Sequence, residues 1–232
     1  MGYREAVALQ EELRRQIRHE GAADALLLLE HPHVYTLGRS ASRSDVLASS
    51  AELAGRDVTV EESDRGGQVT YHGPGQLVGY PVLDLRPDRR DVRRYVRDLQ
   101  RVLVETLARF GVVAEGRMEQ PEIGVWTEGR KIGSIGVHLS RWITTHGFAL
   151  NVATDLDYFR GIVPCGLDRV EMTSIERQTG RRLTPAAVAA VCAEIFAGVF
   201  ERRLVALDAD EHRSGAPPVE VADREAPWAG RS

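Results

Sequence analysis

The sequence predicts one domain of the α/β class, of the α+β type, in which helices flank a mixed, largely antiparallel central sheet. Three observations support this prediction. Helix-like and strand-like segments share the chain, short turn signals join successive strand-like segments in its second half, and neither an internal repeat nor an interdomain linker divides its 232 residues. A chain of this length can bury one sizeable core.

The first half of the chain is expected to contain one helix and several strands. Residues 2–19 place apolar side chains near one side of a helix, and residues 25–30 form a short apolar run typical of a strand buried on both faces. Residues 31–38 are expected to form a loop. Three further strands are expected at 58–61, 68–71 and 77–85. Pro81 indicates an edge or irregular position in the last of them.

The second half is expected to contain two clear helices. Residues 91–110 carry an apolar stripe at helical spacing, and Gly111 is placed to end that helix. Residues 184–201 begin with a Thr-Pro pair, which is typical of an N-cap and a first helical position. Strands are expected between the two helices at 123–128, 131–140 and 142–152. A hairpin turn is expected between the first two of these strands.

The residues after the last helix are expected to form little regular structure. They are rich in proline, alanine and charge and contain few apolar side chains. We therefore expect a folded domain over residues 1–208 and a flexible tail over residues 209–232.

Composition argues against several classes of function. Charged residues make up 28% of the chain and its net charge is −4, which gives no reason to expect nucleic acid or an acidic membrane surface as a partner. No apolar run approaches the length of a membrane span, and the N-terminus lacks the pattern of a signal peptide. With only two cysteines, no disulfide framework is expected, and the chain is expected to work in a reducing cytoplasm.

The two cysteines lie in different contexts. Cys165 lies between Pro164 and Gly166, where neither a helix interior nor a regular strand is comfortable. It is therefore either a nucleophile held on a turn or a small apolar residue in a loop. Cys192 falls on the apolar face of the last predicted helix and is expected to pack in the core.

A glycine-rich segment at 64–76 is the densest unusual feature of the chain. Its four glycines allow a backbone to approach a ligand closely, and polar side chains lie among them. The segment matches neither a Walker A loop nor the dinucleotide-binding fingerprint. We interpret it as a binding loop, with a glycine-rich hairpin as the alternative.

Two strand-like segments add further candidates. Lys131 begins one of them, where it is either a solvated edge residue or a charge over a pocket that lowers the pKa of a neighbouring thiol. His146 and Gly147 interrupt the other, which spans residues 144–152. The histidines match no zinc signature, so no metal is expected, and the lack of a Gly-x-Ser-x-Gly motif argues against a serine hydrolase.

Several arginines gather on one face at and before the helix predicted over residues 91–110. They are Arg90, Arg93, Arg94, Arg97 and Arg101. Aspartates in the same segment dilute their charge. The face is either a docking surface for an acidic partner protein or an ordinary solvated helix face.

Taken together, these segments resemble the lipoyl(octanoyl) transferase family, the octanoyl-[acyl carrier protein]:protein N-octanoyltransferases of lipoate biosynthesis. The matching segments occur in the order of the family at 30–39, 65–76, 130–138, 144–152 and 161–167. The resemblance extends from about residue 25 to residue 180.

The resemblance implies a fold shared with the catalytic domains of biotin protein ligases and lipoate–protein ligases. It also implies that Cys165 is the acyl-thioester nucleophile and that Lys131 lowers the pKa of its thiol. The residues implied to line the acyl-substrate site are Arg65, Gly66, Gly67, Gln68, Val69, Thr70, Tyr71, His72, Ser134, Ile135, Gly136, Gly147, Phe148 and Ala149.

The same resemblance implies octanoyl transfer from octanoyl-acyl carrier protein to a lysine of lipoyl domains, in 2-oxoacid dehydrogenase complexes and the glycine cleavage H protein. No cofactor is implied, and a monomer is expected. Two alternatives remain. An ATP-dependent lipoate–protein ligase has a related fold and acceptor but needs no cysteine nucleophile, whereas a non-catalytic binding module would form no acyl-enzyme.

Overall fold

The computed structural model describes residues 1–87, 89–163, 170–206 and 219–222. The helices are α1 (Tyr3–Glu20), α2 (Ser50–Gly55), α3 (Val92–Arg109), α4 (Ile175–Thr179) and α5 (Pro185–Phe200), with 3₁₀ turns η1 (Arg43–Asp45) and η2 (Leu156–Gly161). The strands are β1 (Asp24–Leu29), β2 (Val34–Leu37), β3 (Thr59–Glu62), β4 (Val69–His72), β5 (Gln76–Val82), β6 (Glu115–Arg117), β7 (Gly124–Thr127), β8 (Arg130–Ser140), β9 (Ile143–Asn151), β10 (Arg203–Ala206) and β11 (Val219–Ala222).

These strands form two sheets. The main sheet has eight strands in the order β10-β11-β1-β5-β9-β8-β7-β6, and each neighbouring pair is antiparallel. The smaller sheet has the order β3-β2-β4, with β2 parallel to β3 and antiparallel to β4. The predicted mixed, largely antiparallel architecture is therefore confirmed.

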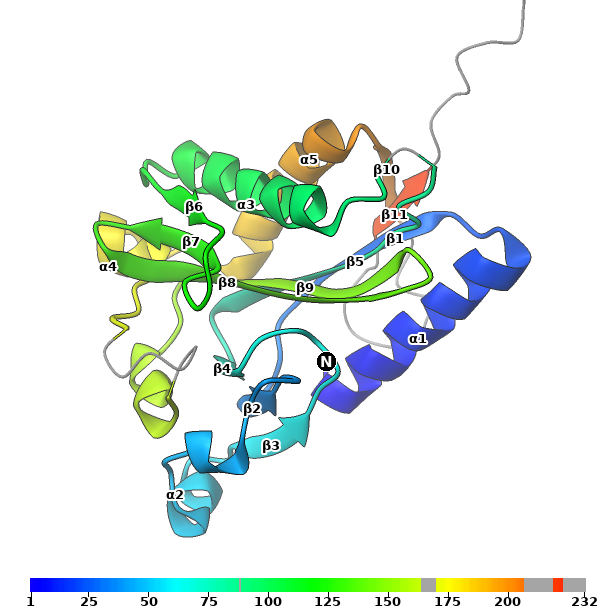
Figure 1. Ribbon diagram of the computed structural model, residues 1–232. Helices are drawn as coiled ribbons and strands as arrows, with labels where there is room; N and C mark the ends of the chain where they lie inside the picture. The colour runs from blue at the N-terminus through cyan, green and yellow to red at the C-terminus, as the bar shows by residue number, and fades with distance from the viewer. Residues whose placement is uncertain (88, 164–169, 207–218, 223–232) are drawn as a thin grey trace, which may run out of the picture.

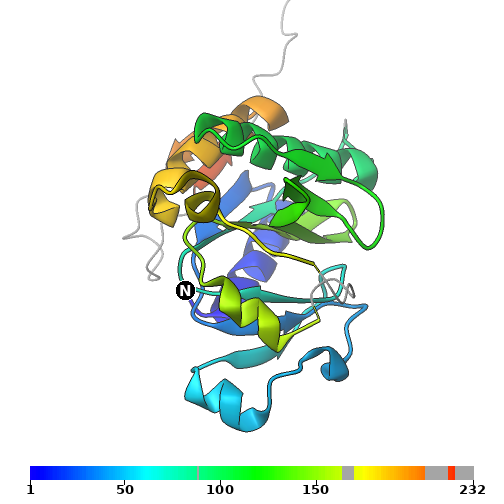
Figure 2. The same cartoon turned by 90° about the vertical axis from the view of Figure 1, so that its left-hand side faces the viewer.

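Helices cover both faces of the main sheet. Helices α3 and α5 lie together on one face, and α1 lies on the other, which also faces the smaller sheet (Figures 1 and 2). The sequence of β1 explains this layering, because Leu26 joins the core beneath α3 and α5 whereas Leu27 packs with Ala6 of α1. The prediction of a strand buried on both faces is confirmed for this run.

The ends of the long helices follow from local sequence. Asp91 is the N-cap of α3 and accepts a hydrogen bond from the N–H of Arg94, and Gly111, with φ of 83°, follows the C-terminal end. Thr184 caps α5 in the same way, and proline occupies its first position. Cys192 of α5 is completely buried, and burial raises the pKa of its thiol to about 12, so its predicted role in core packing is confirmed.

One local prediction in the first half is wrong, and one of the two alternatives for Pro81 is excluded. Residues 34–37 form β2, not a loop, because they pair with β3 on one side and β4 on the other, and both partners are remote in sequence. Pro81 lies in an interior strand rather than at an edge, since β5 pairs with β1 and with β9. The irregular alternative is correct, because the pairing of β5 with β9 ends at Gly79, before the proline.

Part of the segment predicted to be a flexible tail is a strand. Val219–Ala222 form β11, which pairs with both β1 and β10. Little in the sequence indicates this strand, because only two of its four residues are strongly apolar. The rest of the predicted tail, at 209–218 and 223–232, lies outside the described residues.

None of the helices that the structure describes combines the length and the apolar character needed to cross a membrane.

Candidate functional site

A cavity of about 340 Å³ lies beside β8 and β9, a volume within the range of small-molecule sites. It is also lined by the loop before β4, by the first turn of α1 and by the loop before β7. Of the residues predicted to bind substrate, those that line it are Arg65, Gly66, Gly67, Gln68, Val69, Thr70, His72, Ser134, Ile135, Gly136, Gly147, Phe148 and Ala149.

Tyr71 is the one predicted substrate-binding residue that does not line this cavity. It is completely buried on the other side of β4, where its hydroxyl is 2.8 Å from Nδ1 of His33. Its ring stacks on Tyr158, with centroids 4.9 Å apart. Tyr71 therefore packs the smaller sheet against the turn η2.

The register of the sheet brings the other predicted residues together. Ser134 lies opposite Ala149 and Gly136 lies opposite Gly147, so two segments separated in sequence form one surface. The N–H of Gly66 donates a hydrogen bond of 2.9 Å to the carbonyl of Val137, which attaches the glycine-rich loop to the edge of β8. Antiparallel pairing over this length follows from the tight turn between β8 and β9.

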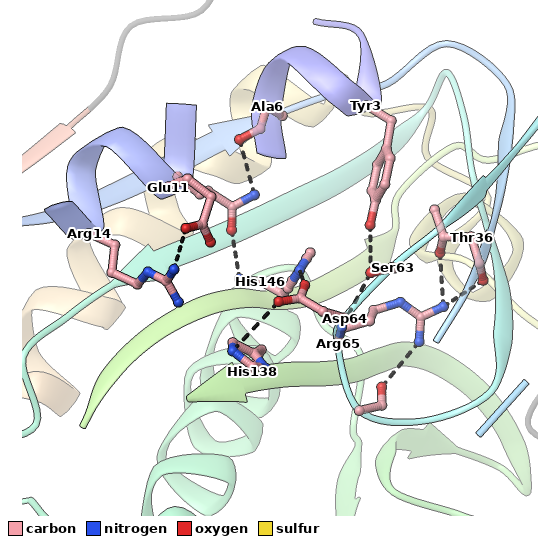
Figure 3. A network of polar contacts seen from close by, with 12 residues as sticks. Tyr3, Ala6, Glu11, Arg14, Thr36, Ser63, Asp64, Arg65, His138 and His146 are labelled. Atoms are coloured by element: carbon pink, nitrogen blue, oxygen red, sulfur yellow. Dashed lines mark hydrogen bonds and ion pairs between the residues drawn. The ribbon is translucent and has the colours of Figure 1, made fainter. Parts of the chain in front are cut away.

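Arg65 fixes the glycine-rich loop to the smaller sheet. Its Nη2 donates hydrogen bonds of 2.7 Å and 2.8 Å to the carbonyl and hydroxyl oxygens of Thr36 (Figure 3). The loop also packs so closely on β8 that a Cβ atom at Gly136 would lie 2.9 Å from the carbonyl oxygen of Gly66. The glycine at 136 thus permits contact between two backbones, in addition to its place on the cavity wall.

A carboxylate and two histidines meet beside His146 in the middle of β9, which continues through the predicted interruption. His146 has φ of 57°, and its Nε2 donates a hydrogen bond of 2.7 Å to Asp64, whose second oxygen lies 3.5 Å from Nε2 of His138 (Figure 3). Burial lowers the pKa of His146 despite the carboxylate. Partial burial would raise the pKa of Asp64, but the hydrogen bond from His146 and the charges of both histidines outweigh it, so its pKa is lowered.

The wall near α1 is built from rings whose polar atoms are engaged within the protein. The Tyr80 hydroxyl lies 2.8 Å from Nε2 of His31, and the Tyr3 hydroxyl donates 2.8 Å to Ser63. Nδ1 of His72 donates 2.8 Å to Gln76. Burial lowers the pKa of His31 to about 4 and lowers that of His72 well below its ordinary value. Both histidines are therefore neutral near pH 7, and His72, which lines the cavity, can contact an apolar ligand there.

Lys131 lies at another part of the cavity lining, at the start of β8. Its side chain is only 1% exposed, and its Nζ lies 5.6 Å from the centroid of the Trp126 ring. Gly124 makes room for it, because a Cβ there would lie 2.7 Å from Cε of the lysine. The burial excludes the solvated alternative and supports a charge that faces a pocket.

Cys165 lies outside the described residues, within 164–169. The described residues Val163, Glu171 and Thr173, before and after this segment, form backbone hydrogen bonds with other parts of the fold. Val163 donates a hydrogen bond of 2.8 Å to the carbonyl of Asp45, and the N–H of Lys131 donates 2.9 Å to the carbonyl of Glu171. Thr173 completes this pairing by donating 2.9 Å to the carbonyl of Lys131, so the chain that follows Cys165 runs beside Lys131.

The cavity also includes residues that the sequence did not indicate. They are Tyr3, Ser40, Tyr80, Val96, Gln120, Pro121, Ile123, Val137 and His146. Most come from elements with another evident task, such as the apolar faces of α1, α3 and β5, so their local pattern predicts only core packing. His146 was indicated as a break in a strand but not as part of the lining.

No group of three or more metal-ligating side chains occurs within the described ranges. The histidines that looked numerous in the sequence have separate surroundings. His31 and His72 contact tyrosines and Gln76, and His138 and His146 share Asp64.

The fold and the cavity define an α/β protein with a small-molecule site between strands β8 and β9 of its main sheet and the glycine-rich loop. The chain belongs to the family described as the lipoyl protein ligase A/B catalytic domain, whose model matches residues 2–197. This match spans the whole of the described cavity lining.

Curated relatives are similar to this chain over most of its length. A protein of Myxococcus xanthus named Octanoyltransferase is 49% identical over 93% of this chain, which spans 59% of that relative's length. Another of the same name, from Solibacter usitatus, is 54% identical over 72% of this chain and 75% of its own length. A third, from Geobacter sulfurreducens, is 48% identical over 86% of this chain and 81% of its own length.

Solved structures share the fold. A lipoate protein ligase of T. acidophilum with bound lipoic acid matches with a TM-score of 0.67 at 14% identity, covering 84% of this chain and 81% of that one. A lipoate-protein ligase A bound with ATP matches with a TM-score of 0.66 at 16% identity, with the same coverage. The predicted similarity to the lipoate ligase catalytic domain is confirmed.

Proposed function

We propose that this protein transfers an octanoyl group from an acyl carrier protein to a lysine of a lipoyl domain through a thioester on Cys165. Octanoyl transfer in lipoate biosynthesis is the activity of its family branch, since curated relatives at 44–54% identity are named Octanoyltransferase. The observation in the structure that most supports this proposal is the cavity. Three segments that are remote in sequence line it together, beside the buried Lys131.

The proposed reaction has two transfers. The thiolate of Cys165 attacks the carbonyl carbon of the octanoyl thioester, a new carbon–sulfur bond forms, and the carrier leaves as a thiol after it takes up a proton. The acceptor amine then attacks the acyl-enzyme, loses a proton and forms an amide, and the Cys165 thiolate is released. An amide is more stable than a thioester, so the overall transfer needs no ATP. The covalent intermediate divides this transfer into two easier steps.

Lys131 is proposed to stabilise the thiolate. A cation beside a cysteine favours its deprotonated form, and this role is supported by the backbone pairing of Lys131 with Glu171 and Thr173, which follow Cys165 by six and eight residues. The negative oxygen of each tetrahedral intermediate also needs N–H donors.

The loop 73–75 is poorly suited to provide these donors. None of its residues lines the cavity, and the N–H of Gly75 already donates 2.8 Å to Glu30. Backbone N–H groups near Cys165 are therefore the favoured oxyanion donors, of the two sets that the sequence left open.

The partners follow from the reaction. We propose octanoyl-acyl carrier protein as the donor and the lipoyl domains of 2-oxoacid dehydrogenase complexes and the glycine cleavage H protein as acceptors. A cytoplasmic, monomeric enzyme fits this role, because both partners are themselves proteins that must reach the cavity.

The test is the intact mass of the protein after incubation with octanoyl-acyl carrier protein without ATP. We expect an octanoyl adduct that neutral hydroxylamine removes, and we expect Cys165→Ser to lack it. Cys192→Ser is the matched control and should acylate normally, because that thiol is buried in the core. A hydroxylamine-sensitive adduct on Cys165→Ser, or acylation of the wild type only with ATP and free octanoate, would contradict the proposal, and the second result would favour a ligase.

A further inference from the structure

The opening of the cavity can be located from its exposed lining. Ser40 and Gly67 are exposed on the side of the smaller sheet, and Gln120 and Pro121 are exposed in the loop before β7. Val96 of α3 also contributes to the lining. Val96 is buried, so the N-terminal half of α3 forms part of the cavity wall near this opening.

Two arginines of α3 flank Val96 in the sequence. Arg93 lies one helical turn before it on the same side of the helix, Arg97 is the next residue along the chain, and both side chains are exposed. Neither forms an ion pair with any residue in the described part of the chain. The other exposed arginines of the helix differ, because Arg94 lies 3.9 Å from Asp98 and Arg101 lies 2.6 Å from Glu105.

A third arginine lies across the opening. Arg39 is exposed, directly precedes Ser40, and donates its backbone N–H to the carbonyl of Arg65 at 3.0 Å. Its guanidinium likewise has no carboxylate partner among the described residues. We call Arg39, Arg93 and Arg97 the arginine rim.

Two of the acidic side chains near the opening are engaged by other groups. Glu122 is paired with Arg117 at 3.1 Å, and Asp64 is held by His146 at 2.7 Å. Glu119 is an exposed carboxylate in the same loop as Gln120. The chain as a whole has a net charge of −4, so a group of arginines that pair with no carboxylate among the described residues is a local departure from its average.

We propose that the arginine rim binds the acyl donor protein, by contact with the phosphodiester that joins the donor's acyl-carrying arm to its acidic surface. This inference rests on the proposed function. When the acyl chain is in the cavity, the arm must pass through the opening and its phosphate must remain outside. Guanidinium groups suit a phosphate because they donate paired hydrogen bonds and keep their charge.

The acceptor is the weaker candidate for this surface. Its reacting group is a lysine side chain, which carries a positive charge before it reacts and has no phosphate. A cationic rim therefore favours the donor over the acceptor in electrostatic terms.

The experiment measures the second-order rate of acyl-enzyme formation for Arg93→Glu/Arg97→Glu and for the single variant Arg97→Glu. The matched control is Arg109→Glu, on the same helix twelve residues further along, or roughly 18 Å away at 1.5 Å per residue. With octanoyl-acyl carrier protein at low salt, we expect Arg97→Glu to react roughly tenfold more slowly, with a weaker dependence on salt, and Arg109→Glu to react as the wild type does.

A donor without a phosphate separates docking from chemistry. With octanoyl-pantetheine, all variants should form the acyl-enzyme at the wild-type rate, and free 4′-phosphopantetheine should inhibit the wild type more strongly than the double variant. Equal rates for the rim variants and Arg109→Glu with the carrier protein would overturn the docking proposal alone. Slower release of the octanoyl group to a lipoyl domain, with unchanged acylation, would assign the rim to the acceptor instead.

The two proposals fail in distinguishable ways. If the wild type forms no acyl-enzyme with either donor, the proposed function fails and the docking proposal falls with it. If the wild type reacts with both donors, only the comparison of variants decides the docking site.

Discussion

At the scale of single residues, the sequence left two interpretations of Lys131 open, and the burial of its side chain decides between them. A charged side chain that is 1% exposed is costly unless its surroundings stabilise it or use its charge. The aromatic ring of Trp126 and the missing side chain of Gly124 provide its space. The residue therefore belongs to the cavity, and its action on the Cys165 thiol is the part that an experiment must establish.

That action can be measured through the reactivity of the thiol. In a Cys192→Ser background, Lys131→Met keeps the length of the side chain but removes its charge, so the pKa of Cys165 should rise by about 1 unit or more. The rate of alkylation against pH reports this pKa. Arg130→Ala is the control, because the neighbouring arginine is half-exposed and pairs with Glu128 and Glu171. An alkylation profile that is the same in Lys131→Met and in its parent would remove Lys131 from the proposed role.

At the scale of elements, the close packing of strands and loops depends on glycines with different tasks. Gly136 admits the glycine-rich loop, and Gly147 admits the backbone of β5, since a Cβ there would lie 2.3 Å from the carbonyl oxygen of Gly79. Gly79 in turn lies against the ring of Phe148, with 2.1 Å between an added Cβ and Cζ of that ring. The sequence placed Gly136 and Gly147 in family motifs but could not show which backbone each of them admits.

Two glycine substitutions should therefore change stability in opposite directions. Gly79→Ala should lower the free energy of unfolding by about 1–3 kcal/mol, because the new methyl group collides with Phe148 in a packed core. Gly198→Ala, on the exposed side of α5 with no atom within 4 Å, should raise it by about 0.5–1 kcal/mol. Urea unfolding monitored by circular dichroism measures both, and a neutral Gly79→Ala would show that β5 and β9 adapt more readily than their packing indicates.

At the scale of the whole molecule, stability depends on pH because burial shifts the pKa of two groups. The two shifts have opposite effects on the free energy of unfolding. Burial lowers the pKa of His31 to about 4, so between pH 4 and about 6.5 the unfolded chain binds a proton that the folded chain does not. The protonation of this group therefore does not reduce the free energy of unfolding above about pH 6.5, and it reduces that free energy progressively as the pH falls below this value. Burial raises the pKa of Asp24 to about 6 despite its contact with Arg202 at 3.3 Å, and this group has the opposite effect.

The two groups can be separated by substitution. His31→Gln should flatten the rise in unfolding free energy between pH 4.5 and 6 by up to about 1.4 kcal/mol per pH unit, the value for one proton. Asp24→Asn should make the same rise steeper, because it removes the group that favours the folded state at low pH. Urea unfolding at pH 4.5, 5.25 and 6 gives the slopes, and parallel slopes for the wild type and both variants would show that neither pKa is shifted by folding.

The whole molecule also shows why the cavity was only partly predictable. The segments 65–72, 134–136 and 147–149 carry family motifs. Thirteen of the fourteen residues that these motifs predict to bind substrate line the cavity, and Tyr71 is the exception. Tyr71 alternates to the other face of β4, and a motif does not show the direction of a side chain. Tyr3 and Val96 were missed because a residue that lines a cavity and one that packs a core have the same pattern on an amphipathic helix.

The sequence by itself determined the helices with clear caps, the antiparallel character of the central sheet, the family and the position of the candidate nucleophile. These properties depend on local spacing and on motifs that residues carry wherever they lie. The tertiary structure decided that residues 34–37 form a strand, that Pro81 lies in an interior strand, that Lys131 is buried, and which arginines remain without partners at the opening of the cavity. Each of these depends on contacts between residues remote in sequence, because pairing, burial and charge neutralisation are properties of neighbours in space.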